Sequence, residues 1–209
     1  MRAVVIGAHL QRDDIEPIAE AVPVGDLFVS GAAVAEDQPL GDRDLLLRVA
    51  ALRARLLERA TFVAVRYGFA IRSSEDAMAK CAALLPRWRR LLTEHRDKVE
   101  MTVKVAASSA AKPRPLRRDF TSGADSLRAL HLATQAASVD PRFREAVSRI
   151  GTARWLHRDD RSLECALLVS RDDVSLAQQA GEQLKREFPE IPFLLSGPWP
   201  LEVFADDHE

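Results

Sequence analysis

The sequence predicts an α+β protein built from two βαββαβ-like sets of elements, at residues 1–72 and 73–209. One observation is composition: 47% of the 209 residues are hydrophobic and 29% are charged, so the chain has enough apolar side chains to form a core. The other is that strand-like alternation and helical periodicity follow one another twice along the chain. This order favours antiparallel sheets that helices cover on one face.

The first set is predicted as a strand at 2–8, a short helix at 12–21, one or two short strands within 27–34, a helix at 42–59 and a strand at 61–67. The helix at 42–59 has the clearest pattern, because apolar residues recur at spacings of four, three and four: Leu45, Val49, Leu52 and Leu56. Gly68 is expected to end the last strand.

The second set begins with a helix from Ser73 or Ser74 to about His95. We expect this helix to kink or break at Pro86, because proline cannot donate the backbone hydrogen bond of a helix interior. The side chains that the helix should bury are Met78, Cys81, Leu85, Trp88 and Leu92.

Residues 98–105 form the clearest predicted strand, because apolar and polar residues alternate there. One face should pack, and the face with Glu100, Thr102 and Lys104 should meet solvent or a partner. An insertion at about 106–160 follows, with a loop at 106–123 and a helical hairpin within 124–150. The set is predicted to end with a strand at 163–169, a helix at 173–188 and a strand at 191–196.

The chain carries almost no net charge, with 30 Lys and Arg against 31 Asp and Glu. The basic run at 112–118 could bind nucleic acid or an acidic partner, but a solvated loop is the more common role of such a run, and we expect no nucleic-acid partner. The longest stretches without a charged residue, 129–139 and 191–201, have 11 residues. A membrane-spanning helix needs roughly 20, so we expect no membrane association.

No motif indicates catalysis, a cofactor or a metal. The histidines at 9, 95, 131, 157 and 208 form no HxxxH or HExxH pattern, and GxSxG, GxGxxG and Walker-type sequences are absent. Cys81 and Cys165 form no CxxC pair, which indicates buried thiols in a reducing cytoplasm rather than a disulfide or a zinc site. We therefore expect no catalytic residue, no cofactor and no metal.

Two groups of motifs resemble a known family. Within 61–105 they are Arg66-Tyr67-Gly68 at the end of a strand, Ser73-Ser74-Glu75 at a helix start, and Glu100 with Val103-Lys104-Val105 in a strand. Near the C-terminus they are Leu-Val-Ser-Arg-Asp at 168–172 and Ser196-Gly197-Pro198-Trp199-Pro200, with Phe204 shortly after. In this order and spacing, the motifs resemble the gas vesicle protein F and L (GvpF/GvpL) family.

The sequence departs from the family pattern at two places. Val63-Ala64-Val65 stands where family members usually have Leu-Pro-Met, and Leu201-Glu202-Val203-Phe204 stands where they tend to have Pro-Tyr-Ser-Phe. The chain is therefore identified as a divergent member.

The resemblance implies two ferredoxin-like or modified ferredoxin-like domains, the second with the helical insertion. It also implies a cytoplasmic accessory protein of gas vesicle formation, associated with the small hydrophobic shell protein (GvpA), with other vesicle proteins and with the vesicle itself. A shell subunit exposes aggregation-prone apolar surface before assembly, and an accessory protein can cover it.

The residues that we expect to bind a partner or to dock the domains are Arg66, Tyr67, Gly68, Glu100, Lys104, Gly197, Pro198, Trp199 and Pro200. Trp199 lies between two prolines and is either a displayed anchor or a core residue of the second domain, and the core position is favoured. Glu100 and Lys104 either form a polar contact surface for the shell protein, or Glu100 meets Arg66 in an inter-domain ion pair.

A function of another class is also compatible with this fold. Ferredoxin-like domains host many functions, so the chain could bind a small molecule as an enzyme or a sensor. That function predicts a concave pocket with convergent polar groups and a perturbed titratable residue. A third alternative is a protein-interaction role outside vesicle biology.

Overall fold

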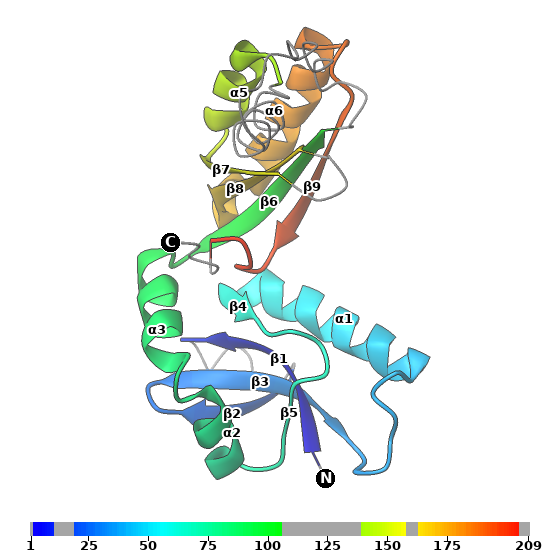
Figure 1. Ribbon diagram of the computed structural model, residues 1–209, viewed down its shortest axis with the longest axis vertical. Helices are drawn as coiled ribbons and strands as arrows, with labels where there is room; N and C mark the ends of the chain where they lie inside the picture. The colour runs from blue at the N-terminus through cyan, green and yellow to red at the C-terminus, as the bar shows by residue number, and fades with distance from the viewer. Residues whose placement is uncertain (1, 11–18, 106–138, 158–162, 205–209) are drawn as a thin grey trace, which may run out of the picture. The chain divides into compact units, whose positions relative to one another are not determined.

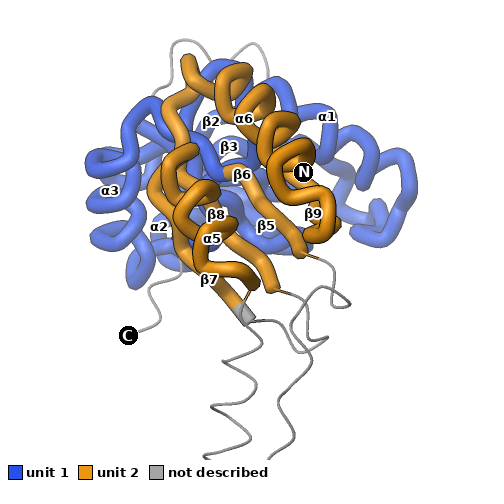
Figure 2. The backbone as a smooth tube through the Cα atoms, turned by 90° about the horizontal axis from the view of Figure 1, so that it is seen from above, with its two compact units in different colours: residues 1–100, 198–209 blue, residues 101–197 orange. Residues whose placement is uncertain are grey.

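The polypeptide passes twice between two compact units (Figures 1 and 2). In the computed structural model the described residues are 2–10, 19–105, 139–157 and 163–204. Unit 1 contains Met1–Glu100 and Pro198–Glu209, and unit 2 contains Met101–Gly197. The chain leaves unit 1 within strand β6 (Lys98–Val105) and returns to it within strand β9 (Phe193–Trp199).

The sheet of unit 1 is formed, within the described residues, by β1 (Arg2–His9), β2 (Glu20–Val24), β3 (Leu27–Val34), β4 (Phe62–Ala64) and β5 (Ala70–Ile71). The strand order is β2-β3-β1-β4, and β5 also pairs with β1. β1 is antiparallel to β3, β4 and β5, and β2 is antiparallel to β3.

Three predicted elements of the first set are found in this sheet. The strands at 2–8 and 27–34 are confirmed, and the strand at 61–67 is shorter than predicted, at 62–64. The helix predicted at 12–21 lies mostly outside the described residues, and its last two residues begin β2.

Helix α1 (Arg43–Arg59) confirms the predicted amphipathic helix. It begins after Asp42, whose side-chain oxygen accepts the backbone N–H of Leu45 at 2.9 Å and so satisfies a donor of the first turn. The helix packs on β1 and β3. Its buried residues are Leu45, Val49, Leu56 and Leu57.

The helix predicted from Ser73 or Ser74 to His95 is broken, as expected, into α2 (Ser74–Cys81) and α3 (Leu85–Glu94). Pro86 lies in the first turn of α3, where its missing N–H has no helical partner to lose. Met78 is 40% exposed and not buried as predicted, because the adjacent Ala77 takes the inward position.

The two helices also explain why the units divide at a different place from the predicted boundary between residues 72 and 73. Helix α2 packs on β2 and α3 packs on β4, so both belong to the sheet of unit 1. The sequence shows where each helix begins and ends, but not which sheet it covers.

The sheet of unit 2 has the order β7-β8-β6-β9, where β7 is Thr152–His157 and β8 is Leu163–Ser170. β7 and β8 are antiparallel. Helix α5 (Pro141–Ser148) precedes β7, and a short 3-10 turn η2 (Arg171–Asp173) leads into helix α6 (Val174–Glu187) before β9. When the strands of each unit are numbered along the chain, both sheets have the order 2-3-1-4, which is that of the ferredoxin-like fold.

The core of unit 2 contains alternate side chains of β6, as predicted, and alternate side chains of β8. Phe143 of α5 and Leu184 of α6 pack in the same core, and Phe143 meets the ring of Phe188 edge-on with centroids 5.4 Å apart. β7 was not predicted. The predicted loop at 106–123 and most of the predicted hairpin within 124–150 lie outside the described residues, and α5 is the described part of that hairpin.

Candidate functional site

The C-terminal segment of unit 1 is attached to β6 by the buried side chain of Glu100, which is 3% exposed. One carboxylate oxygen accepts the backbone N–H groups of Glu202 and Phe204 at 2.9 and 2.7 Å. The other oxygen accepts the N–H of Val203 at 3.0 Å. Three successive backbone N–H groups therefore converge on one carboxylate and form an anion-binding nest.

The protonation of Glu100 reflects two opposing effects. Burial raises the pKa of the carboxyl group above its ordinary value of 4.5, and the three backbone N–H groups oppose this rise. The predicted ion pair between Glu100 and Arg66 is not formed, because Glu100 is held by backbone dipoles and the Arg66 side chain is exposed. The alternation in β6 had predicted that Glu100 lies on an exposed polar face. This prediction is wrong, because the side chain is buried.

The segment that Glu100 holds also extends the sheet of unit 1. The N–H of Leu201 donates to the carbonyl of Phe62 at 2.9 Å, and the N–H of Ala64 donates to the carbonyl of Leu201 at 3.2 Å. Leu201 thereby forms a one-residue parallel bridge with Val63 of β4 and is fully buried. The C-terminal segment thus covers part of the free edge of β4, the strand at one end of the order β2-β3-β1-β4.

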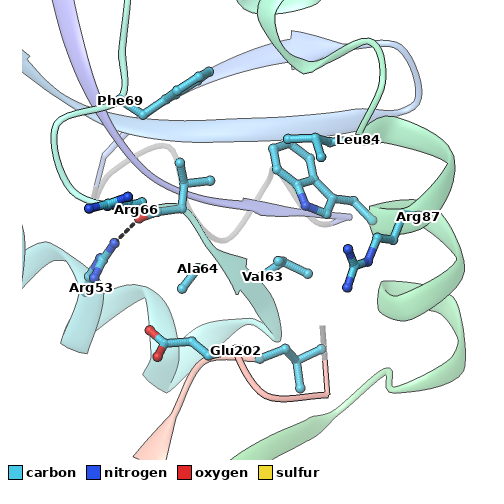
Figure 3. A pocket seen from close by; sticks show the side chains of 11 residues that line it. Arg53, Val63, Ala64, Arg66, Phe69, Leu84, Arg87 and Glu202 are labelled. Carbon is cyan, nitrogen blue, oxygen red and sulfur yellow. Dashed lines mark hydrogen bonds between the residues drawn. The ribbon is translucent and has the colours of Figure 1, made fainter. Parts of the chain in front are cut away.

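Beside this bridge, unit 1 contains an open pocket of about 560 Å³ (Figure 3). Its lining comes from α1, β4 and the turn after it, α3, and the C-terminal segment. The lining residues are Arg53, Val63, Ala64, Val65, Arg66, Phe69, Leu84, Arg87, Trp88, Leu201 and Glu202. The volume lies within the range of about 300–1,000 Å³ that is typical of ligand sites.

The pocket combines an apolar floor with charged side chains at its edge. Figure 3 shows Arg53 and Arg66 at one side of the floor and Arg87 at the other, with Glu202 on the C-terminal segment. Among the described residues, the lining has three guanidinium groups and one carboxylate, so the formal charge of this part of the lining is positive.

Arg53 is the most constrained of the three arginines. Its side chain is half-buried and donates a hydrogen bond to the carbonyl of Val65. Its Nε–H is buried and has no acceptor among the described residues. Burial lowers the pKa of the guanidinium group, and the negative charge of Glu202 opposes this effect. A desolvated cation of this kind gains more from an anionic neighbour than a cation in water does.

The other motif residues of unit 1 have structural roles next to the pocket. The hydroxyl of Tyr67 donates to the carbonyl of Leu40. Gly68 has a φ of 96°, a left-handed conformation that favours glycine, and it ends the extended segment after β4 as predicted. Of this motif, only Arg66 lines the pocket.

Lys104 lies in unit 2, where its exposed side chain forms an ion pair with Glu164 at 3.4 Å. It therefore does not share the surroundings of Glu100, although the two residues are only four positions apart on β6.

The run Gly197-Pro198-Trp199-Pro200 begins inside β9 and ends in the C-terminal segment. Gly197 has a φ of 127°, and Pro200 is buried. Trp199 is 47% exposed, so the favoured prediction that it closes the core of the second domain is wrong. Leu195 is the last residue of β9 that packs on the core of unit 2, and Trp199 lies four positions beyond it.

A family model described as gas vesicle synthesis protein GvpL/GvpF matches residues 16–205 of the chain. The chain belongs to this family. The resemblance that was inferred from the motifs at 61–105 and 196–200 is thereby confirmed.

Two crystal structures of the GvpL/GvpF family member GvpF resemble the whole chain. GvpF from Microcystis aeruginosa matches with a TM-score of 0.71 and 12% identity, over 98% of this chain and 99% of that chain. GvpF from Anabaena sp. PCC7120 matches with a TM-score of 0.69 and 11% identity, over 100% of this chain and 99% of that chain. At these identities the likeness shows the fold. No curated protein matches the chain.

The sequence analysis identified only some of the residues that line the pocket of this GvpL/GvpF protein. Arg66 was selected from its motif, and Trp88 was predicted to be buried. Arg53, Arg87 and Glu202 were not selected, because they come from three separate elements and belong to no motif. The only signal for Glu202 was its position in the departure from the family pattern at 201–204.

Within the described residues, no group of three or more His, Cys, Asp or Glu residues could hold a metal ion, and no helix there is long and apolar enough to cross a bilayer. Cys81 and Cys165 are free and buried, and burial raises the pKa of the Cys165 thiol to about 12.

Proposed function

We propose that this member of the GvpL/GvpF family is a non-enzymatic accessory protein of gas vesicle assembly that binds the small hydrophobic shell protein (GvpA). The observation that carries the proposal is the family match over residues 16–205. Other vesicle accessory proteins are proposed as further partners, and the cytoplasm and the gas vesicle as the places of action.

The physical basis is the protection of apolar surface. A shell subunit that is not yet incorporated exposes apolar area that would otherwise aggregate, and a partner with apolar side chains on its own surface can cover it. The large apolar side chains that are exposed among the described residues are Leu46, Leu47, Met78, Leu84, Leu176, Leu194 and Trp199. Binding of this kind involves no chemical step, and the net charge of −1 does not favour nucleic acid as a partner.

The test is co-expression of the tagged chain with the shell protein from the same genome, followed by affinity purification and quantification of retained shell protein. We expect retention above that of an unrelated tagged α+β protein. Glu58→Gln, a change at an exposed position of α1, should retain as much shell protein as the unchanged chain. Absence of retention, together with normal vesicles after deletion of the gene, would contradict the proposal.

A second candidate function, small-molecule binding, is favoured by one observation. The pocket of about 560 Å³ has an apolar floor and convergent polar groups, and the pKa of Arg53 at its edge is lowered by burial. Equilibrium dialysis against small carboxylates of increasing chain length would test it, because saturable binding that improves with chain length requires both the cations and the floor.

A further inference from the structure

We propose that the pocket of unit 1 is a docking site for a short acidic, amphipathic segment of a partner protein, whose apolar side chains cover the floor and whose carboxylates meet the arginines. The inference names the chemistry of the segment and does not depend on the shell protein being the partner.

The apolar part of the pocket has a buried base and accessible walls, because Ala64 and Phe69 are half-buried and Leu84 is 39% exposed. Figure 3 shows Val63 and Ala64 of β4 at the centre of the pocket, and the buried side chains of Trp88 and Leu201 also contribute to its lining. The pocket is open, so a protruding side chain of another molecule can enter without a movement of the backbone. A volume of about 560 Å³ can hold more than one large apolar side chain.

The charges at the edge select the sign of the partner. Arg53 and Arg66 lie at one side of the floor and Arg87 at the other, as Figure 3 shows, and Glu202 is the acidic residue among the described residues of the lining. Because Arg53 and Arg66 lie together at one side of the floor, the arrangement suits a segment that carries a carboxylate beside its apolar side chains. Arginine also binds carboxylates through two parallel hydrogen bonds, which fixes their geometry.

Two of the arginines are arranged to bind an anion in different ways. The guanidinium group of Arg53 is held in place by the carbonyl of Val65, so it loses little conformational freedom on binding. Arg66 is exposed and makes no side-chain hydrogen bond or ion pair with the described residues. It can therefore turn toward a partner without giving up a contact.

The experiment uses the full chain and three fluorescein-labelled twelve-residue peptides. The first has two leucines four positions apart with a glutamate on each side, the second has lysine in place of glutamate, and the third has serine in place of leucine. We expect saturable binding of the first peptide and binding weaker by about tenfold or more for the other two, measured by fluorescence anisotropy. Binding of the first peptide should weaken as the salt concentration rises.

Variants of the chain then locate the binding surface. Arg66→Glu reverses a charge at an exposed position, and Ala64→Leu fills the floor, so each should weaken binding of the first peptide by about tenfold. The matched control is Arg55→Glu, which makes the same change at an exposed position of α1 outside the lining and should leave the affinity within about twofold. Melting curves of all three variants would verify that each is folded.

Several results would overturn the proposal. They are equal binding of the acidic and basic peptides, no saturable binding of any peptide, and equal effects of Arg66→Glu and Arg55→Glu. Decanoate could also displace the peptide at the decanoate concentration that saturates the pocket in the absence of peptide. This result would show that the occupant is a small carboxylate instead. Peptide binding without shell-protein retention would support the docking site and contradict the proposed function. Shell-protein retention without peptide binding would support the proposed function and contradict the docking site.

Discussion

The buried carboxylate of Glu100 accepts the backbone N–H of Phe204 at 2.7 Å, although the two residues are 104 positions apart. The same side chain binds the N–H groups of Glu202 and Val203. Leu201 and Glu202 line the pocket, so the side chain of Glu100 and the bridge between Leu201 and β4 together fix the position of one pocket wall. Glu100 is thus a positioning residue for the pocket, and this relationship can be tested by removing the carboxylate.

Glu100→Ala should lower the free energy of unfolding by about 2–3 kcal/mol, because it leaves three backbone N–H groups without their charged acceptor. Denaturant unfolding at neutral pH would measure this loss. Glu58→Ala, at an exposed position of α1, should change the stability by less than about 0.5 kcal/mol. Equal stabilities of the two variants would show that the C-terminal segment is held mainly by the burial of Leu201 and Phe204.

The free energy of unfolding should depend on pH in the direction that the raised pKa of Glu100 sets. Because burial raises the pKa of Glu100 in the folded state, the folded protein keeps this proton at pH values at which the unfolded chain has released it. The resulting stability is complete below the ordinary value of 4.5 and is lost as the pH rises through the raised pKa. The difference in unfolding free energy between the unchanged chain and Glu100→Gln should therefore shrink as the pH rises.

An internal comparison of opposite sign is available at Asp76, whose pKa is lowered chiefly by its hydrogen bond from Lys80. The stability that Asp76 contributes is present above its ordinary value of 3.8 and is lost as the pH falls through the lowered pKa. The corresponding difference for Asp76→Asn should shrink as the pH falls. If the stability difference between the unchanged chain and Glu100→Gln also shrinks as the pH falls, the three backbone N–H groups lower the pKa of Glu100 by more than burial raises it.

Gly7 of β1 should be intolerant of any side chain, because a Cβ atom there would contact the ring of Phe62 and lie 2.8 Å from the carbonyl oxygen of Val63. Gly7→Ala is expected to lower the stability by about 3 kcal/mol, since β4 must move away from β1. Gly41→Ala is the control, because a Cβ atom at Gly41 has no neighbour within 4 Å. Equal melting temperatures of the two variants would show that β4 can shift without loss.

The sequence predicted those parts of the fold that depend on local periodicity. The apolar spacing in α1 and the packed face of β6 were predicted correctly, because each places one row of apolar side chains in a core. β7 (Thr152–His157) was missed because its sequence, TARWLH, does not alternate between apolar and polar residues throughout. Its adjacent residues Arg154 and Trp155 are both half-buried in the structure.

Features that depend on distant parts of the chain could not be predicted. In β6, alternation assigned Glu100 to an exposed face, but the end of the chain returns to this position and buries the carboxylate under three N–H groups. The pocket likewise joins α1, β4, α3 and the C-terminal segment, and no local pattern specifies that these four meet. For the same reason the unit boundary was placed after residue 72 instead of after residue 100.

The two tryptophans of unit 1 should respond differently to replacement by alanine. Trp88 is 6% exposed, so Trp88→Ala should lower the stability by about 3–5 kcal/mol, as the loss of a buried aromatic side chain does. Trp199 is 47% exposed, and Trp199→Ala should lower it by less than about 1 kcal/mol. Thermal and denaturant unfolding of both variants would measure these changes.

The same Trp199→Ala variant tests whether the indole contacts a partner. If Trp199 is part of the surface that binds the shell protein, retention of the shell protein in co-purification should fall while the melting temperature stays the same. Pro198 and Pro200 restrain the backbone on both sides, so the indole is held in a fixed direction before binding and loses little freedom when a partner covers it. A loss of stability as large as that of Trp88→Ala would instead place the indole in a core, and unchanged retention at unchanged stability would exclude Trp199 from the contact.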